Sequence, residues 1–432
     1  PGSVGMLASS LYQLLDGIFV GQILGNEAFA ALNLVMPFVI INFAISDLIG
    51  VGSAVPISVR LGEKRPEEAN NIFTIACLLI FGQGIVVGGA LYFLAPTLLG
   101  LMGAEGALAA MAVQYLRVYA VCSPIVGCVF ASDNFLRICG QIRTSMMLNV
   151  LMSVLCVVFE FFFLAVLRIG IRGAALGTCL SMMVCAFLAM LPFFRGKMAL
   201  KFVRPKFSRR ILGQIVSCGC PTFLNNIAGR VTSIIMNMVL LQLGGASAVS
   251  VYGILMYADG IILQLMYGMC DSLQPAVGYN WGAARRDRVV AIERCCFTAA
   301  AVISLVGAAV LFTFPRQTAE LFMATAGAEV LDMAEPALRI FSLTYITRWF
   351  SFATQSFVSA IEKPVQASIL SVSTALLFPV GLIVALWPMG LSGLWANMPG
   401  TALLAGITAG IILLDLRRRV WSSPHKVREP GA

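Results

Sequence analysis

The stretch GVGSAVPISVRLGEKRPEEA (Gly50–Ala69) contains the pattern that the rest of the chain repeats. An uncharged apolar run ends at Val59, and a short loop with Arg60, Lys64 and Arg65 follows before the next apolar run begins. A helix needs about 20 mostly apolar residues to cross a bilayer. The stretch therefore predicts two membrane-spanning helices joined by a basic loop.

The composition extends this prediction to the whole chain. Of its 432 residues, 59% are hydrophobic and 11% are charged, against roughly 25% charged in soluble proteins. The mean hydropathy is +0.91. A soluble fold has too few polar groups here to cover its surface. The apolar runs are continuous rather than alternating, which favours helices over barrel strands. We predict an all-α integral membrane protein.

Twelve apolar stretches are long enough to span a bilayer. The chain begins at Pro1, directly before the first of them, and we expect that span to be truncated. The predicted spans are Gly2–Leu24, Asn33–Val59, Asn70–Leu99, Leu108–Leu136, Thr144–Leu167, Gly173–Phe194, Leu212–Leu243, Ala248–Asn280, Val289–Phe314, Pro336–Ile361, Val365–Trp387 and Gly393–Leu416.

The distribution of basic residues predicts the orientation. The loops after even-numbered spans, together with the C-terminal tail, contain 21 Lys and Arg residues, whereas the loops after odd-numbered spans contain only Arg168, Arg172 and Arg316. Loops rich in Lys and Arg remain in the cytoplasm. We therefore predict that both termini are cytoplasmic, in the inner membrane. The net charge of +9 does not indicate nucleic-acid binding, because no soluble basic domain is present.

The chain also divides into two similar halves. Shifting the second half back by 220 positions superimposes small residues at comparable span ends, and a basic loop follows the second long span of each half. Repeated halves with a site between them are a recurring transporter design. The superimposed pairs are Gly25 with Gly245, Ala28 with Ala248, Gly62 with Gly282 and Gly173 with Gly393.

The predicted organisation follows from this repeat. It comprises two pseudo-symmetric six-helix lobes, a basic cytoplasmic linker and a basic cytoplasmic tail. Their residues are 1–194, 211–416, 195–210 and 417–432, respectively.

Several stretches resemble one known family. LYQLLDGIFVGQILG (Leu11–Gly25) resembles the first span of the multidrug and toxic compound extrusion (MATE) family, and Gly50–Ala69 is similar to its second span and loop. IGIRGAALGT (Ile169–Thr178) and SCGCPTF (Ser217–Phe223) are similar to the starts of its sixth and seventh spans. The resemblance covers essentially the whole chain. It implies two lobes around a central cavity, and export of cationic or amphipathic compounds in exchange for H⁺ or Na⁺.

Acidic side chains inside spans are candidates for the coupling site. Burial makes protonation and cation binding competitive at a carboxylate. Asp16 lies in the middle of the first span, and the resemblance implies that it matches the family's first-span aspartate. We expect it to be the principal coupling residue, although an Asp can also serve only to fix helix packing.

The resemblance implies a second group of coupling residues. Glu160 falls where the family has an aspartate, Cys156 replaces the family's asparagine, and Thr178 matches its hydroxyl. An alternative alignment uses Asn149 and Ser153, which gains an amide but loses the acid. Beyond Na⁺ at Asp16 and Glu160, we expect no metal.

The remaining candidates lie mostly in the second half. Where some relatives have a glutamate, this chain has Asn225 and Asn226, which disfavours a sodium site there. We expect Asp259, Asp271 and Asp47 to contribute to a substrate cavity, although Asp271 also fits a position near the cytoplasmic end. We expect the arginines in or near spans to pair with acids such as Asp133 or Asp47; they are Arg117, Arg230, Arg339 and Arg348.

These features predict a monomeric antiporter for small organic molecules, without a cofactor other than its coupling ion. The only histidine, His425, lies in the polar tail, and the twelve cysteines have no metal-ligand spacing. The chain lacks a phosphate-binding GxxxxGK[ST] loop and a catalytic cluster, so we do not expect an enzyme. The alternatives are a lipid-linked oligosaccharide flippase, which requires a cationic central cavity, and a membrane scaffold without transport activity.

Overall fold

The computed structural model describes residues 4–5, 8, 23–102, 105–322 and 328–418. Helices dominate these residues, and no strand occurs among them. Within this part of the chain, ten helices are long and apolar enough to cross a membrane. The prediction of an all-α integral membrane protein is confirmed. The first predicted span, Gly2–Leu24, lies almost entirely outside the described residues.

The first half contains six α-helices in its described part. A π-helical turn, η2, extends α6 at the end of the fifth predicted span. The elements are α2 (Asn26–Gly62), α3 (Pro66–Leu101), α4 (Gly106–Val126), α5 (Cys128–Ile138), α6 (Ile142–Phe161), η2 (Phe162–Val166) and α7 (Ile171–Phe194).

The second half begins with a continuous run of helix that supplies two spans. Within α8, Gly245 has φ 65° and ψ −160°, so the chain kinks there between the spans Arg209–Gly245 and Ser247–Gly282. The elements are α8 (Arg209–Gly282), α9 (Arg286–Thr313), α10 (Pro315–Phe322), α11 (Ala328–Ser342), α12 (Thr344–Ala360), α13 (Pro364–Val372), η3 (Ser373–Leu377), α14 (Phe378–Ala385), η4 (Trp387–Met389) and α15 (Gly390–Leu416).

The fourth span of each half is interrupted. The span predicted at Leu108–Leu136 consists of α4 and α5, which meet at Gly127. The span predicted at Pro336–Ile361 consists of α11 and α12, which meet at Leu343. The same break in both halves supports an internal repeat.

The backbone repeats the shift found in the sequence. Positive φ angles occur at Gly25 and Gly245, at Lys64 and Ala284, and at Gly170 and Gly390, and each pair lies 220 positions apart. Such angles are uncommon for residues with a Cβ atom. Their recurrence at three turns with the same spacing indicates an internal repeat. The two-lobe architecture is confirmed, while the residue bounds given for lobes, linker and tail stay predictions.

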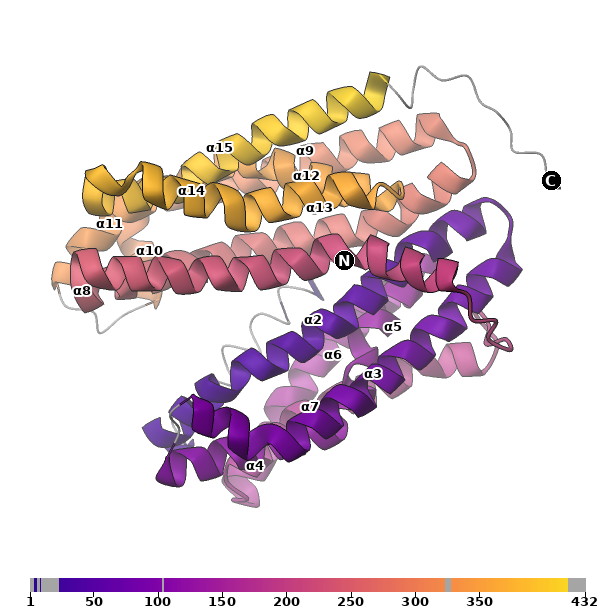
Figure 1. The fold of residues 1–432 in the computed structure, drawn as a ribbon, viewed down its shortest axis with the longest axis horizontal. Coiled ribbons are helices and arrows are strands. Elements are labelled where there is room, and N and C mark those ends of the chain that lie inside the picture. The colour runs from indigo at the N-terminus through magenta and orange to yellow at the C-terminus, as the bar shows by residue number, and fades with distance from the viewer. Residues whose placement is uncertain (1–3, 6–7, 9–22, 103–104, 323–327, 419–432) are drawn as a thin grey trace.

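The two lobes have their own apolar cores and diverge from one end of the molecule (Figure 1). At this end lie the loops α2–α3, α7–α8 and α8–α9, which carry many of the basic residues, and we call it the basic end. Large apolar side chains such as Phe93 and Val86 remain 77% and 71% exposed on the outside. A bilayer covers such a surface without cost.

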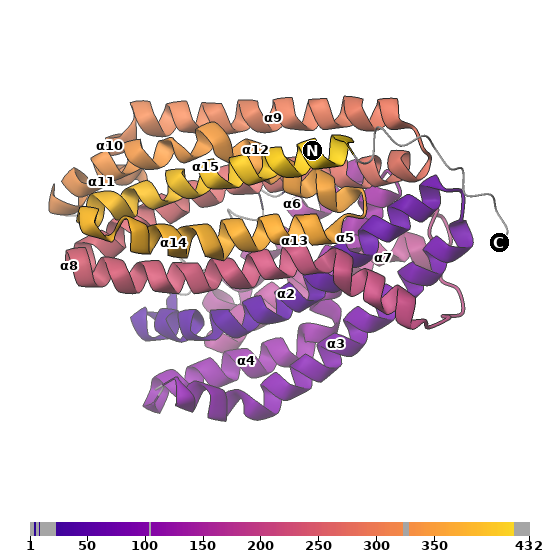
Figure 2. The same ribbon diagram turned by 45° about the horizontal axis from the view of Figure 1, so that its top comes forward.

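The lobes meet where α2 lies alongside α8 (Figure 2). Four glycines allow the backbones to touch: a Cβ atom on Gly62 would lie 2.0 Å from the Tyr279 carbonyl oxygen, and one on Gly282 would lie 2.1 Å from that of Val59. Gly52 and Gly219 make equally close approaches, at 2.1 Å and 1.9 Å from the carbonyl oxygens of Ile215 and Leu48. We call these four residues the glycine seam. It closes the contact between the lobes at the basic end.

Candidate functional site

Glu160, near the end of α6, is the centre of a buried polar cluster in the first half. The residue is only 1% exposed. Thr178 on α7 donates a hydrogen bond of 2.8 Å to its Oε1, and the Cys156 thiol donates to the same oxygen at 3.2 Å. Cys156 Sγ also lies 3.8 Å from Thr178 Oγ1. The structure thus brings together the three residues that the resemblance implied.

Local backbone geometry explains this cluster. A Cβ atom on Gly177 would lie 2.7 Å from Glu160 Cγ, so only glycine lets α7 approach the acid this closely. Directly after Glu160, the helix widens into the π-helical turn η2. Such turns frequently occur at functional sites. The arrangement positions Glu160 on the inside of the bundle rather than towards lipid.

The alternative residues of the first half form a separate cluster. Asn149 on α6 donates a 3.0 Å hydrogen bond to Asp133 Oδ1, and Ser145 donates to the same oxygen. Arg137 completes the cluster with an ion pair of 2.6 Å to Asp133 Oδ2. Ser153 donates instead to the backbone oxygen of Asn149. Asn149 therefore accompanies an acid, but one that is already ion-paired.

Asp259 on α8 is a buried acid of the second half, at 7% exposed. Arg348 NH1 lies 2.6 Å from Asp259 Oδ1, and the Tyr345 hydroxyl donates to that oxygen at 2.5 Å. Both donors are on α12. The carboxylate is thus neutralised by an arginine and fixed by a phenol.

This pairing corrects the expectation that Arg348 takes Asp133 or Asp47 as its partner. Arg348 pairs with Asp259, and Asp133 pairs with Arg137 from its own helix. Arg339 pairs with Glu335 at 2.9 Å. The Arg117 guanidinium lies 5.3 Å from the centre of the Tyr92 ring.

Three further predicted site residues belong to none of these clusters. Asp16 lies outside the described residues. Asp271 belongs to α8, but its side chain is outside the described part. Asp47 is half-buried on α2. Their roles in coupling or substrate binding stay predictions.

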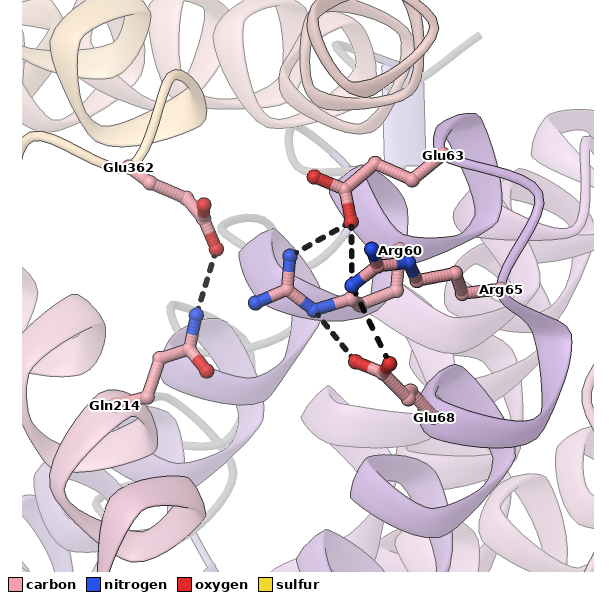
Figure 3. Close-up of polar contacts among 6 residues, drawn as sticks. All are labelled: Arg60, Glu63, Arg65, Glu68, Gln214 and Glu362. Atoms are coloured by element: carbon pink, nitrogen blue, oxygen red, sulfur yellow. Dashed lines mark hydrogen bonds and ion pairs between the residues drawn. The ribbon is translucent and has the colours of Figure 1, made fainter. Parts of the chain in front are cut away.

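A charged cluster surrounds a cavity of about 910 Å³ at the basic end. Arg60 at the end of α2 pairs with Glu63 at 2.9 Å and with Glu68 at 3.2 Å, and Arg65 lies within 4 Å of the same two acids (Figure 3). These four residues belong to the first half. The cavity lies next to the glycine seam, because Gly282 also lines it.

The second half contributes Glu362 to the same cavity, from the turn between α12 and α13 (Figure 3). Gln214 on α8 donates a 2.8 Å hydrogen bond to Glu362 Oε1. Burial raises the pKa of the Glu362 carboxyl above its ordinary value, and the charge of Arg60 opposes that shift. The sequence offered no signal for this group, because Glu362 is an ordinary loop acid.

Known proteins resemble the chain over nearly its full length. The family model described as MatE matches residues 1–162 and 221–385. The multidrug export protein MepA of Staphylococcus aureus (strain NCTC 8325 / PS 47) is 25% identical over 428 residues, which cover 97% of this chain and 93% of that protein.

Solved structures resemble it as well. A MATE protein in complex with MaL6 has a TM-score of 0.91 and 25% identity, covering 97% of this chain and 95% of that one. An outward-facing multidrug resistance MATE family transporter of the MOP superfamily has a TM-score of 0.90 and 24% identity, covering 98% and 95%. Because the family model matches well over half of the sequence, the chain belongs to the MatE family, the multidrug and toxic compound extrusion transporters.

Proposed function

We propose that this chain is a secondary active antiporter of the cytoplasmic membrane. It exports cationic or amphipathic small organic molecules in exchange for an inward flow of protons or Na⁺. Family membership and the name of its relative MepA, a multidrug export protein, support this proposal. The basic loops support an orientation with both termini in the cytoplasm.

The observation that carries the proposal is the buried carboxylate of Glu160 between α6 and α7. Burying a charged carboxylate is costly unless a proton or a cation neutralises it. The donors that reach it from Cys156 and Thr178 are neutral. Binding of an ion at Glu160 therefore changes the charge inside the first lobe, which is the change that a coupling site requires.

The chemistry of the cluster favours the proton over Na⁺. Hard cations require several oxygen ligands, and a thiol is a poor ligand for them. Cys156 occupies a position next to the acid, 3.2 Å from Glu160 Oε1. A proton needs only one carboxylate oxygen and tolerates a thiol beside it.

The glycine seam is the contact between the lobes that we expect to open and close during transport. With the basic end in the cytoplasm, the contact of α2 with α8 closes the transporter on that side. A ligand can shift such a protein only if it binds one arrangement better than the other. Proton binding at Glu160 and substrate binding between the lobes favour different arrangements, so that one drives the other.

The flippase alternative requires cationic groups in the central region. Arg348 is a largely buried arginine of the second lobe, with its side chain 19% exposed, but Asp259 neutralises it at 2.6 Å. This pairing makes the exporter the better supported function.

Uptake of a fluorescent organic cation into inside-out vesicles tests the proposal. The chain is compared under an imposed proton gradient and an imposed Na⁺ gradient, together with Glu160→Gln and Asp16→Asn. We expect accumulation driven by the proton gradient that is lost in Glu160→Gln, and Asp16→Asn tests the predicted first-span acid in the same way. Accumulation driven only by Na⁺ would refute the proton assignment, and no transport by folded protein under either gradient would refute antiport.

A further inference from the structure

Three sulfur atoms meet between α8 and α9, in the second half. Cys296 Sγ lies 3.9 Å from Cys270 Sγ and 3.6 Å from Met269 Sδ. Cys270 and Met269 lie on α8, whereas Cys296 lies on α9. The two cysteines are 26 positions apart, which is why their spacing in the sequence resembles no metal motif.

The two cysteines line a small void, and Met269 Sδ reaches Cys296 from beside it. Cys270 is 1% exposed and Cys296 is 5% exposed. A void of about 10 Å³ lies beside them, lined also by Glu293 and Gln274. That volume accommodates about one water-sized particle, so it has the size of a single ion.

Glu293 provides an acidic group in the same void. It lies three residues before Cys296 on α9, hence on the same helix face. Its side chain is 4% exposed, and its Oε1 has no hydrogen-bond partner among the described residues. The nearest cation is Arg417, whose NH2 is 3.9 Å away. This oxygen thus has a long ion-pair contact but accepts no hydrogen bond among the described residues, which leaves it able to accept a proton.

The distances from Cys296 Sγ to the other two sulfurs, 3.9 Å and 3.6 Å, match those around a soft metal ion. Three sulfur ligands at about 2.3 Å from a central ion lie about 4 Å apart in a trigonal plane. Thiolate and thioether sulfurs select Cu(I)-like ions over hard cations. Among the described residues, no group of three His, Cys, Asp or Glu side chains can hold a metal ion. A methionine sulfur is therefore needed to complete this site, which excludes metals that require harder ligands.

We propose that Cys270, Cys296 and Met269 form a binding site for one soft monovalent metal ion, Cu(I) or Ag(I). When the ion binds, the Cys296 thiol loses its proton to Glu293 as the sulfur–metal bond forms. The added positive charge of the ion is thereby balanced by the thiolate, and Glu293 becomes neutral. The site then contains no net charge in its apolar surroundings, and it links α8 to α9.

Metal retention by the purified full-length chain tests this proposal. Ag(I) serves as the probe because it does not change oxidation state. The protein is dialysed anaerobically in buffer without a reducing agent, and the retained silver is then measured by mass spectrometry. Because the chain has twelve cysteines, the informative quantity is the difference between variants. Cys270→Ser/Cys296→Ser is compared with the matched control Cys218→Ser/Cys220→Ser.

We expect the most tightly bound Ag(I) ion per chain to be absent in Cys270→Ser/Cys296→Ser and present in the control. Met269→Leu, which preserves packing, is expected to weaken the binding of that ion by roughly tenfold or more. Ag(I) is also expected to protect Cys270 and Cys296 from alkylation. Retention that is equal in all variants would overturn the site. A disulfide between the two cysteines that forms readily, without silver retention, would also overturn it in favour of a redox pair.

Discussion

Glu160 in the first half and Asp259 in the second half are both buried acids on inward-facing helices, but their donors differ. Glu160 accepts from a hydroxyl and a thiol, Thr178 and Cys156. Asp259 accepts from Arg348 and Tyr345. A carboxylate held by an arginine has its charge already balanced, whereas one held by neutral donors gains from binding a proton. The comparison supports the proposed coupling site at Glu160 and favours a structural role for Asp259.

The largest effect is expected for Glu160→Gln. The amide has the shape of the acid and can still accept from Thr178, but it cannot bind or release a proton at neutral pH. Proton-driven uptake in proteoliposomes should fall to the level of protein-free liposomes, while the thermal unfolding temperature changes little. Glu67→Gln, at an exposed acid near the start of α3, is the control and should transport normally. Full transport by Glu160→Gln would show that Glu160 is not the coupling residue, and the proposed difference between Glu160 and Asp259 would then be wrong.

Arg348→Ala should cause the largest loss of stability. Removing one partner of a buried ion pair costs about 3–5 kcal/mol, since the other charge is left buried. Thermal unfolding in detergent should show this loss, and the double variant Arg348→Gln/Asp259→Asn should recover most of it. Equal stability of Arg348→Ala and the wild type would mean that the pair does not fix the second lobe.

Thr178→Val tests the hydrogen bond to Glu160 without a change in side-chain shape. A hydrogen bond to a charged group contributes about 1.5–3 kcal/mol, so the dependence of transport on proton concentration should shift by about tenfold or more. The measurement is the half-maximal proton concentration of uptake. Thr298→Val removes a hydroxyl from an exposed position on α9 and should leave that value unchanged.

The smallest effect concerns Glu362 at the basic end. Burial raises its pKa above the ordinary value of 4.5 in this closed arrangement. The neutral carboxyl therefore stabilises the closed arrangement fully below pH 4.5, and this contribution is lost as the pH rises through the raised pKa. The measurement is the distance between spin labels at Glu67→Cys and Arg288→Cys. The fraction of protein in the closed arrangement should be larger at mildly acidic pH than at neutral pH.

Glu362→Gln should flatten this response, because the amide remains neutral at every pH. Glu105→Gln, at an exposed acid beside α4, is the matched control and should respond like the wild type. An undiminished response in Glu362→Gln would assign the pH dependence to another group.

Much of the fold could be predicted from patterns that persist locally. Apolar runs predicted ten of the described spans, because length and hydropathy alone determine whether a helix can cross a bilayer. The repeat was visible in pairs such as Gly62 and Gly282, which the structure places in contact with the opposite lobe. The break in α11–α12 at Leu343 was missed, because a mid-span turn leaves the apolar run intact.

The partners of buried charges could not be predicted in the same way. The sequence contained Asp259 and Arg348 in separate spans, 89 positions apart, and the prediction that Arg348 pairs with Asp133 or Asp47 was wrong. Which acid meets which base depends on how α8 and α12 are rotated against each other. Helix rotation follows from the packing of every neighbouring side chain, and no local pattern encodes it.

By itself, the sequence determined that this chain crosses a membrane, that it consists of two related halves, and that a MATE-type transporter is expected. These properties depend on composition, periodicity and repeats, which each segment has independently of the others. Only the tertiary structure decided that Thr178 and Cys156 surround Glu160, that Arg348 neutralises Asp259, and that Cys270 meets Cys296. Contacts within a few ångströms depend on helix rotation and close approach, which are properties of the packed bundle as a whole.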